Sequence, residues 1–377
     1  MSAASPAPGF DAPARIMMVT PRFPPYRGGV ETHTYEVSRR VAAEPGFEVT
    51  VLTTDLAGSL PPSENLEGVQ VERVGAYPPW ADLYWSPAVH RRVRAERPDL
   101  VHVQGYHTLV PPLALLAARR ARIPYLVTLH SGGHSSRLRN AIRPIQVRLL
   151  RPLLRGAARV IAVSAFEATH FAEAHGLGRD NLTVIPNGAD IGGPHATGHR
   201  DPDLIMSVGR LERYKGHHRV VEALSYVQRS LPNARLRIVG GGPYEASLRA
   251  LVARHGLDAS VDIVSVPSGE MGRLLGSASV VTLLSEYESQ GLAVHEALAR
   301  GCRVVVDSGS ALAEVAGLEQ ATAVSSGDPP QVIAAALVDQ LTRGRVGAAA
   351  TPDLLTWDDC AAATSALYAS VLRARSG

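Results

Sequence analysis

Two kinds of segment alternate along the chain. Short runs rich in Val, Ile and Leu are bounded by glycine, proline or polar residues, and most precede a longer stretch with apolar residues every three or four positions. The first kind is typical of buried parallel strands, and the second of the helices that cover them. The predicted strands are residues 15–20, 49–53, 69–74, 100–103, 125–129, 160–163, 204–208, 236–239, 261–264, 280–284 and 303–306.

The alternation restarts after a break in the middle of the chain. Pro186, Asn187 and Gly188 begin a stretch rich in Gly, His and Pro that ends at Pro202. Such composition marks a hinge between domains. We therefore predict an α/β protein with two Rossmann-like, doubly wound domains that face each other across a cleft. Its predicted parts are a disordered tail (1–13), an N-terminal Rossmann-like domain (14–186), a hinge (187–202), a C-terminal Rossmann-like domain (203–350) and a terminal helix (351–377) that returns to the N-terminal domain.

Composition narrows the class of protein. The 377 residues are 45% hydrophobic, which is enough for sizeable cores, and the net charge of +3 is too small to indicate a nucleic-acid partner. Cys302 and Cys360 form no CxxC pair and are predicted to be buried thiols in a reducing compartment. Apolar runs end well short of the ~20 residues that a spanning helix needs. The N-terminus has no secretion signal, so we expect a cytoplasmic protein.

Lys215 is the only lysine in a chain that otherwise uses arginine as its cation. A position that keeps lysine under such bias is one where the wide guanidinium is unsuitable and a compact ammonium is needed. Lys215 follows the predicted strand 204–208 together with Arg210, and Gly216 and a predicted helix come next. Two cations in such a connection can clamp a diphosphate without a metal ion.

Two carboxylates at a fixed spacing follow another predicted strand. Glu288 lies in the connection after residues 280–284, and Glu296 lies in the helix that follows. Carboxylates accept hydrogen bonds from sugar hydroxyls, and the backbone amides of residues 290–292 at the helix start could hold a phosphate. Gly291 would allow close backbone approach. Two glutamates at this spacing are also common on solvated helices, but the strand, glycine and helix around them favour a binding site.

Three weaker signals in the N-terminal half leave alternatives open. Gly28 and Gly29 before a predicted helix (30–43) would let backbone amides approach an anion, although many loops contain such a pair. His130 ends the predicted strand 125–129 and would face the cleft, or would only cap the strand. The aromatic loop 77–85 could stack on an acceptor or pack on itself.

Arginines recur at helical spacing at residues 148, 151, 155 and 159, opposite apolar residues at 142, 145, 149 and 153. This pattern fits a helix in peripheral contact with the inner face of a membrane, or a wall for an anionic acceptor. A solvated face of an ordinary helix is favoured, because Pro144 and Pro152 are expected to break its continuity.

Two patterns could suggest a metal site. Asp201 and Asp203 match the D-x-D of metal-dependent transferases, but they lie in a turn, where Asp is common. His130 and His134 would need a helix to face the same way, and the glycines between them argue against one. We therefore expect no metal and no cofactor.

Taken in order, these motifs resemble those of glycosyltransferase family 4, whose members have the GT-B fold. The resemblance runs across residues 15–372. It is carried by Gly28-Gly29-Val30-Glu31, Thr128-Leu129-His130, Val163-Ser164, Pro186-Asn187-Gly188, Gly209-Arg210 with Lys215-Gly216, Gly240-Gly241-Gly242-Pro243, Glu288 through Glu296, and Trp357.

The resemblance implies a retaining transferase that moves a sugar from a nucleoside-diphosphate sugar to a hydroxyl of a glycolipid, glycan or natural product. It implies that Arg210 and Lys215 hold the diphosphate, that Glu296 takes the ribose, and that His130 lies near the donor sugar. The donor sugar would be held by Glu288 and by the backbone amides of Ser289, Gln290, Gly291 and Leu292, with the Gly28-Gly29 loop closing over the reaction centre.

The chain departs from the family pattern at three places. Gln290 stands where an aromatic residue is usual, which bears on the identity of the sugar. Gly241 replaces an acidic residue, and residues 265–267 replace a usual glycine near the base.

Two other functions fit parts of the pattern. A nucleotide-sugar epimerase can use the same two-domain fold, and a sugar-nucleotide-binding subunit would lack catalysis. The filled set of Arg210, Lys215, Glu288 and Glu296 favours transfer over both. A dinucleotide-dependent oxidoreductase is disfavoured, because no GxGxxG follows the first strand.

Overall fold

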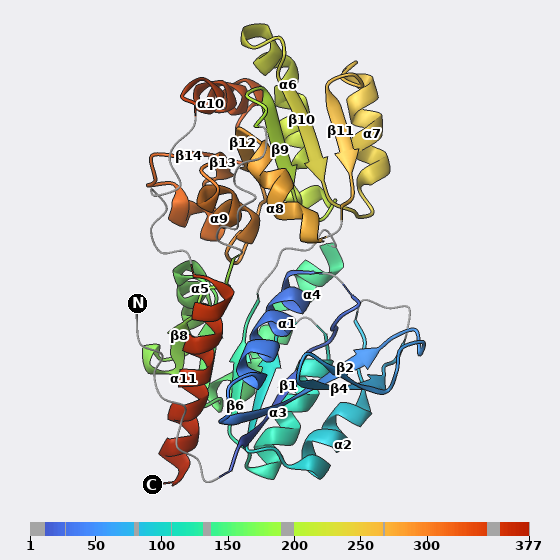
Figure 1. Ribbon diagram of the computed structural model, residues 1–377, viewed down its shortest axis with the longest axis vertical. Coiled ribbons are helices and arrows are strands. Elements are labelled where there is room, and N and C mark those ends of the chain that lie inside the picture. The colour runs from blue at the N-terminus through green and yellow to red at the C-terminus, as the bar shows by residue number, and fades with distance from the viewer. Residues whose placement is uncertain are drawn as a thin grey trace. The chain divides into compact units, whose positions relative to one another are not determined.

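The computed structural model describes residues 12–26, 28–78, 83–106, 108–130, 137–189, 200–266, 268–344 and 355–376. These residues form two compact units (Figure 1). The first unit contains residues 12–130, 141–188 and 357–376, and the second consists mainly of residues 189–356. Each unit is a mostly parallel sheet with helices on both faces, which confirms the predicted α/β class with two Rossmann-like units.

The sheet of the first unit has the order β3-β4-β2-β1-β5-β6-β7-β8, and only β3 runs antiparallel to its neighbour. The central strands β1, β5 and β6 are mostly buried and rich in apolar residues, as the sequence predicts. The strands are β1 Ala14–Val19, β2 Phe47–Asp55, β3 Ser63–Leu66, β4 Val69–Gly75, β5 Leu100–Gln104, β6 Tyr125–Thr128, β7 Arg159–Ala162 and β8 Leu182–Val184.

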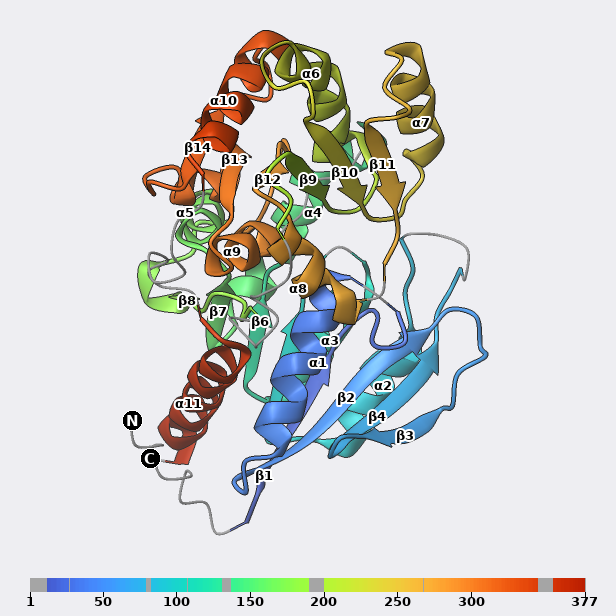
Figure 2. The same cartoon turned by 45° about the horizontal axis from the view of Figure 1, so that its top comes forward.

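Alternation along β1 distributes the core of this unit between the two faces of the sheet. Ile16 and Met18 pack with side chains of α1 (Gly29–Ala42) and α11 (Trp357–Ser376). Met17 and Val19 point to the opposite face, because successive side chains of a strand alternate. That face is covered by α2 Pro87–Glu96, α3 Val110–Ala121, α4 Arg137–Arg155 and α5 Ala165–His175 (Figure 2).

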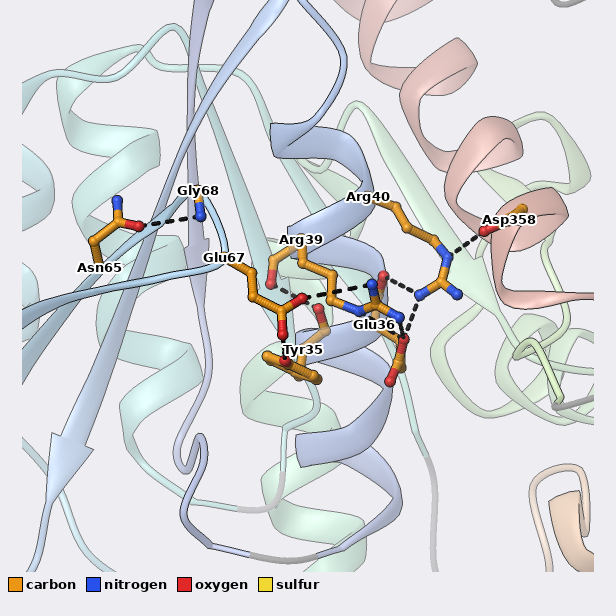
Figure 3. A network of polar contacts seen from close by, with 9 residues as sticks. Tyr35, Glu36, Arg39, Arg40, Asn65, Glu67, Gly68 and Asp358 are labelled. Carbon is orange, nitrogen blue, oxygen red and sulfur yellow. Dashed lines mark hydrogen bonds and ion pairs between the residues drawn. The ribbon is translucent and has the colours of Figure 1, made fainter. Parts of the chain in front are cut away.

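A polar network joins three elements on the α1 side of this unit (Figure 3). The Tyr35 hydroxyl donates to Glu67 Oε1 over 2.8 Å, which ties α1 to the turn between β3 and β4. Arg40 pairs with Glu36 on its own helix and with Asp358 in the first turn of α11. The buried contacts of α11 and this network hold the last helix of the chain against α1.

The sheet of the second unit has the order β11-β10-β9-β12-β13-β14, and every neighbouring pair is parallel. When the six strands are numbered 1 to 6 along the chain, their order across the sheet is 3-2-1-4-5-6. This is the strand order of dinucleotide-binding folds. The strands are β9 Leu204–Val208, β10 Arg235–Val239, β11 Val261–Val264, β12 Val280–Leu283, β13 Arg303–Asp307 and β14 Ala321–Val324. The helices are α6 His217–Ser230, α7 Glu245–Arg254, α8 Ser268–Ser277, α9 Leu292–Ala299 and α10 Pro330–Thr342.

The helices of this unit also divide between the two faces. Ile205 of β9 packs with α6, α7 and α10, whereas Leu204 and Met206 pack with α8 and α9. Strand β9 is therefore buried on both sides at the centre of the sheet, and its carboxyl end is fixed by the core around it.

The structure corrects the prediction for the arginine-rich helix. α4 continues through Pro144 and Pro152, whereas Arg159 begins β7. Leu150 and Leu154 are buried on either side of Pro152, and their packing offsets the hydrogen bond that proline removes. Two residues of the predicted apolar face, Ile145 and Leu149, are exposed.

Candidate functional site

The second unit has its topological switch point between β9 and β12. These strands are neighbours, and from them the sheet grows outward in both directions. In open α/β sheets, ligands bind at the carboxyl ends of the strands at such a point. Residues 209–216 follow β9 and residues 284–291 follow β12, so both predicted donor-binding motifs lie at this edge.

Lys215 and Glu288 meet across these two connections. Lys215 Nζ lies 2.5 Å from Glu288 Oε1, and the two side chains are only 15% and 14% exposed. Burial alone would lower the pKa of Lys215, but Glu288, with smaller contributions from Tyr214 and Glu212, more than offsets that effect and the pKa is raised. The ammonium therefore stays charged in a pocket where arginine would need more room.

Glu288 is held by several further contacts. The Ser285 hydroxyl donates to Glu288 Oε1 over 2.8 Å, so lysine and serine share one carboxylate oxygen. Glu288 N donates to Ser310 Oγ over 3.0 Å, and Ala311 N donates to the Glu288 carbonyl over 3.2 Å. The carboxylate is thus fixed by its own backbone as well as by its partners.

Gly216 lets the two connections approach each other. Its φ is +75°, and a Cβ at this position would lie 2.0 Å from the Leu284 carbonyl oxygen. Glu286 N donates to the Tyr214 carbonyl over 2.9 Å, which joins the same two segments. Any side chain at position 216 would push them apart and separate Lys215 from Glu288.

Arg210 differs from Lys215 in its surroundings. Its side chain is 62% exposed, and its Nε lies 3.3 Å from Glu212 Oε1, whereas the Glu212 side chain is buried. The second predicted cation therefore stands at the surface, beside the buried lysine in sequence. No contact between Arg210 and Glu288 is present among the described residues.

His217 also lies at this edge of the sheet, and the sequence pattern alone did not indicate it. Its Nδ1 lies 2.8 Å from Ser207 Oγ, and its Nε2 lies 3.3 Å from the Arg210 carbonyl. Burial lowers its pKa to about 4, so the ring is neutral at pH 7 and adds no charge beside Lys215. Its position directly after the Lys215-Gly216 pair was the available signal.

Helix α9 begins at this edge of the sheet. Gly291 precedes it with φ +77°, and a Cβ there would meet Leu312 at 2.6 Å, so glycine is required. Ser289 is half-buried and Gln290 is buried, and Leu292 is the first helical residue. Glu296 lies within α9 and is half-buried.

His130 lies at the carboxyl edge of the sheet in the first unit, next to β6. Its backbone is in the left-handed region (φ +45°), and its side chain is 7% exposed. Its Nε2 lies 2.9 Å from Gln104 Oε1, and because an amide oxygen only accepts, this ring nitrogen carries the proton. The His33 ring packs edge-on at 4.6 Å between centroids.

A buried chain of polar groups continues from Gln104. The Gln104 amide nitrogen lies 3.4 Å from both ring nitrogens of His102. His102 contacts the Tyr368 hydroxyl of α11 at 2.6 Å and Thr128 Oγ1 at 2.7 Å. Gln104, His102 and Tyr368 were not predicted, because only the fold brings them together.

Gly28 and Gly29, at the start of α1, occupy ordinary backbone conformations. Gly28 is extended (φ 169°) and caps α1, and its carbonyl accepts the first helical bond from Thr32 N. A Cβ at Gly28 would meet the Glu31 carboxylate at 2.2 Å, whereas Gly29 has open space around it.

The D-x-D pattern is used in a turn, as the favoured interpretation expects. Asp201 pairs with Arg235, and its Oδ1 accepts from Asp203 N over 3.1 Å. His134 and Trp80 lie outside the described residues. No group of metal-ligating side chains is found among the residues that the structure describes. No helix in the described part of the chain is long and apolar enough to cross a membrane.

Two family models match the chain, one in each half. Residues 27–192 match Glycosyltransferase Family 4, and residues 195–344 match Glycosyl transferases group 1. The chain is 31% identical over 332 residues to a glycogen synthase of Mycobacterium tuberculosis, covering 80% of this chain and 79% of that protein. It therefore belongs to glycosyltransferase family 4 and is an enzyme of the hexose-transferring kind.

A second relative agrees with this assignment, and two solved structures share the fold. The GDP-mannose:cellobiosyl-diphosphopolyprenol alpha-mannosyltransferase of Xanthomonas oryzae pv. oryzae is 30% identical over 301 residues, covering 76% of this chain and 77% of that protein. Sucrose-phosphate synthase from Thermosynechococcus elongatus matches with a TM-score of 0.75 at 21% identity, covering 96% of this chain and all of that one. Anabaena HepE in complex with UDP-glucose matches with a TM-score of 0.69 at 19% identity, covering 96% and 97%. These likenesses confirm the GT-B fold.

Proposed function

We propose that this enzyme moves a sugar from a nucleoside-diphosphate sugar to a hydroxyl acceptor, with retention of anomeric configuration and without a metal ion. The observation that carries the proposal is the buried Lys215–Glu288 pair at the switch point of the second unit. The sheet edge where it lies is the ordinary nucleotide-binding edge of this strand order. The Xanthomonas relative is named for GDP-mannose, and a relative from Frankia alni is named for D-inositol 3-phosphate. The HepE structure is named as a complex with UDP-glucose.

In this proposal the charges of the site act on the leaving group. Negative charge develops on the diphosphate as the glycosidic bond to it breaks, and Lys215 and Arg210 stabilise that charge. Lys215 is positioned before the donor arrives, because Glu288 and the packed connections fix its ammonium. Little reorganisation is then needed in the transition state.

The remaining predicted residues act on binding and orientation. Glu296 takes the ribose hydroxyls, and Glu288 with the amides at the start of α9 takes the donor sugar. His130 lies near the donor sugar, and the Gly28-Gly29 loop closes over the reaction centre. His130 donates its Nε2 proton to Gln104 in this structure, so its hydrogen bond to a sugar hydroxyl needs the other ring nitrogen as acceptor or a change of partner.

The acceptor is a hydroxyl of a glycan, a glycolipid or a natural product. We place the reaction in the cytoplasm, in accord with Cys302 and Cys360, which are both buried thiols outside any disulfide. No observation favours the epimerase or the non-catalytic subunit over transfer.

A thermal-shift panel of UDP-, GDP-, ADP- and dTDP-sugars tests the donor class. A donor at 100 times its dissociation constant should stabilise the protein by about 2.7 kcal/mol. The best donor is then assayed after exhaustive chelation, where activity should persist. Absence of any stabilising sugar nucleotide contradicts the donor class, and loss of activity that magnesium or manganese restores contradicts metal independence.

A further inference from the structure

The positive charge of this protein is concentrated in one segment. The whole chain carries 38 Lys and Arg against 35 Asp and Glu, yet residues 100–166 hold ten arginines and no acidic residue. The rest of the chain is therefore acidic on balance. This segment includes all of α4, whose 19 residues contain six of the ten arginines.

The second half of α4 exposes apolar side chains among its arginines. Ile145 is 61% exposed and Leu149 is 72% exposed, one helical turn apart, whereas Leu150 and Leu154 face the core. Arg148 is exposed beside them on the same surface of the helix. Two large aliphatic side chains held in water are a cost that ordinary solvated helices avoid.

Two of the arginines beside this strip, Arg151 and Arg155, are fixed in place by backbone carbonyl groups. Arg148, Arg151, Pro152 and Arg155 line a hollow of about 520 Å³. Arg151 Nε donates to the His175 carbonyl over 2.6 Å, and Arg155 donates to the Gly176 carbonyl over 3.1 Å. These bonds satisfy the end of α5 but leave the positive charges in place, and among the described residues none of the three arginines forms an ion pair with a carboxylate.

Further exposed apolar residues continue from α4. Gln146 donates to the Tyr106 carbonyl over 2.7 Å, which brings α4 to the segment that carries Leu109. Leu109 N donates to the Tyr84 carbonyl over 3.0 Å, and Trp85 pairs with Tyr77. Leu109, Leu83, Trp85 and Tyr77 are each between 41% and 60% exposed. With Ile145 and Leu149 they make six of the eight large exposed apolar side chains in the described residues.

We infer that this surface, made of Ile145, Arg148, Leu149, Arg151 and Arg155, docks on an anionic lipid bilayer. An amphipathic helix lies in the plane of a membrane when aliphatic side chains enter the acyl boundary and flanking arginines pair with lipid phosphates. Arginine stems can cover the apolar strip while their guanidinium groups reach the headgroups. A small soluble anion would use the charges, but it would leave Ile145 and Leu149 in water.

The test is flotation of the full chain with vesicles. Wild type should float with vesicles that contain phosphatidylglycerol, and should stay in solution with phosphatidylcholine alone or at high salt. Arg148→Glu should weaken binding about 30-fold, because it changes two units of charge. Leu149→Asp should weaken it by at least about tenfold, because an aliphatic anchor is lost.

Arg254→Glu is the matched control. It makes the same charge change at an exposed position of α7 in the other unit, and it should float like wild type. All three side chains are exposed, so thermal unfolding should be unchanged. The inference is overturned if the wild-type protein does not float with anionic vesicles. So does a loss with Arg148→Glu alone, which would indicate a soluble or protein anion. Vesicle binding needs neither donor nor acceptor, so the outcome is independent of the proposed transfer reaction.

Discussion

Lys215 Nζ and Glu288 Oε1 lie 2.5 Å apart, although 73 positions separate the two residues in the sequence. Lys215 is the one lysine of the chain, and Glu288 is the first carboxylate of the spaced pair. The contact joins the residue that is predicted to bind the diphosphate to the residue that is predicted to bind the donor sugar. With the proposed roles, donor binding would require the ammonium to be shared between the carboxylate and the diphosphate.

Replacing Lys215 should test this pairing. Lys215→Met leaves Glu288 as a mostly buried carboxylate with only Ser285 as a side-chain partner, so the free energy of unfolding should fall by about 1–3 kcal/mol. Adding Glu288→Gln should recover most of that loss, as measured by urea denaturation of the two single variants and the double variant. If the two losses simply add, the pair has no coupling in the folded protein.

Substitutions of Glu296 and Glu288 should change different steady-state constants. Glu296→Gln should mainly raise the donor KM, because ribose contacts act equally in the ground state and the transition state. Glu288→Gln should mainly lower kcat, because that carboxylate is expected to touch the sugar and holds the Lys215 ammonium in place. The reverse pattern would exchange the two assignments.

His130→Ala should fold and bind free nucleoside diphosphate nearly as wild type does, yet lose most transfer. Gln104→Leu removes the acceptor for His130 Nε2 without removing the imidazole, and should lower kcat with little change in donor KM. Both variants need a denaturation curve, because His130 is buried. An unfolded His130→Ala, or one with the wild-type rate, would make the residue structural.

Buried neutral histidines should make the protein sensitive to acid. Burial lowers the pKa of His102 to about 3 and that of His33 to about 4, against 6.5 in the unfolded chain. Their stabilising effect is complete above pH 6.5 and is lost as the pH falls below it, because the unfolded chain then binds protons first. Each should cost about 2 kcal/mol between pH 6.5 and 5.

His102→Gln should therefore flatten the decline of stability between pH 6.5 and 5, as measured by denaturant unfolding. His255→Gln, at the exposed end of α7, is the matched control and should decline as wild type does. Equal slopes for the wild type and His102→Gln would contradict the assignment of a neutral, buried His102.

The central strands were predictable because they are continuous apolar runs, and the missed strands are those without one. β3 reads Ser-Glu-Asn-Leu and alternates between exposed and half-buried positions, and β8 and β14 are short and only partly buried. They lie at or beside the edges of their sheets, where one face or one side meets water. The sequence therefore indicated strands through apolar runs, which are typical of buried strands, and not through the strand propensity of single residues.

Residue type and spacing were enough to find Lys215 and Glu288, but their contact was not predictable. It depends on β9 lying next to β12 and on Gly216 fitting against Leu284. The link from His102 to Tyr368 is a stronger case, since 266 positions separate them. The exposure of Leu149 also escaped prediction, because periodicity cannot tell which apolar stripe of a helix meets the core.

The central claim is that Arg210 and Lys215 hold a diphosphate at the end of β9. The direct measurement is calorimetric titration of a nucleoside diphosphate, UDP or GDP as the donor panel selects, into wild type, Arg210→Ala, Lys215→Arg and Arg213→Ala. Arg213 is exposed in the same turn as Lys215 and is the matched control. We predict that Arg213→Ala binds like wild type, whereas Arg210→Ala and Lys215→Arg lose about 10- to 100-fold, the value of a charge-assisted hydrogen bond. Wild-type affinity in Lys215→Arg, or an equal loss in all three variants, would contradict the account.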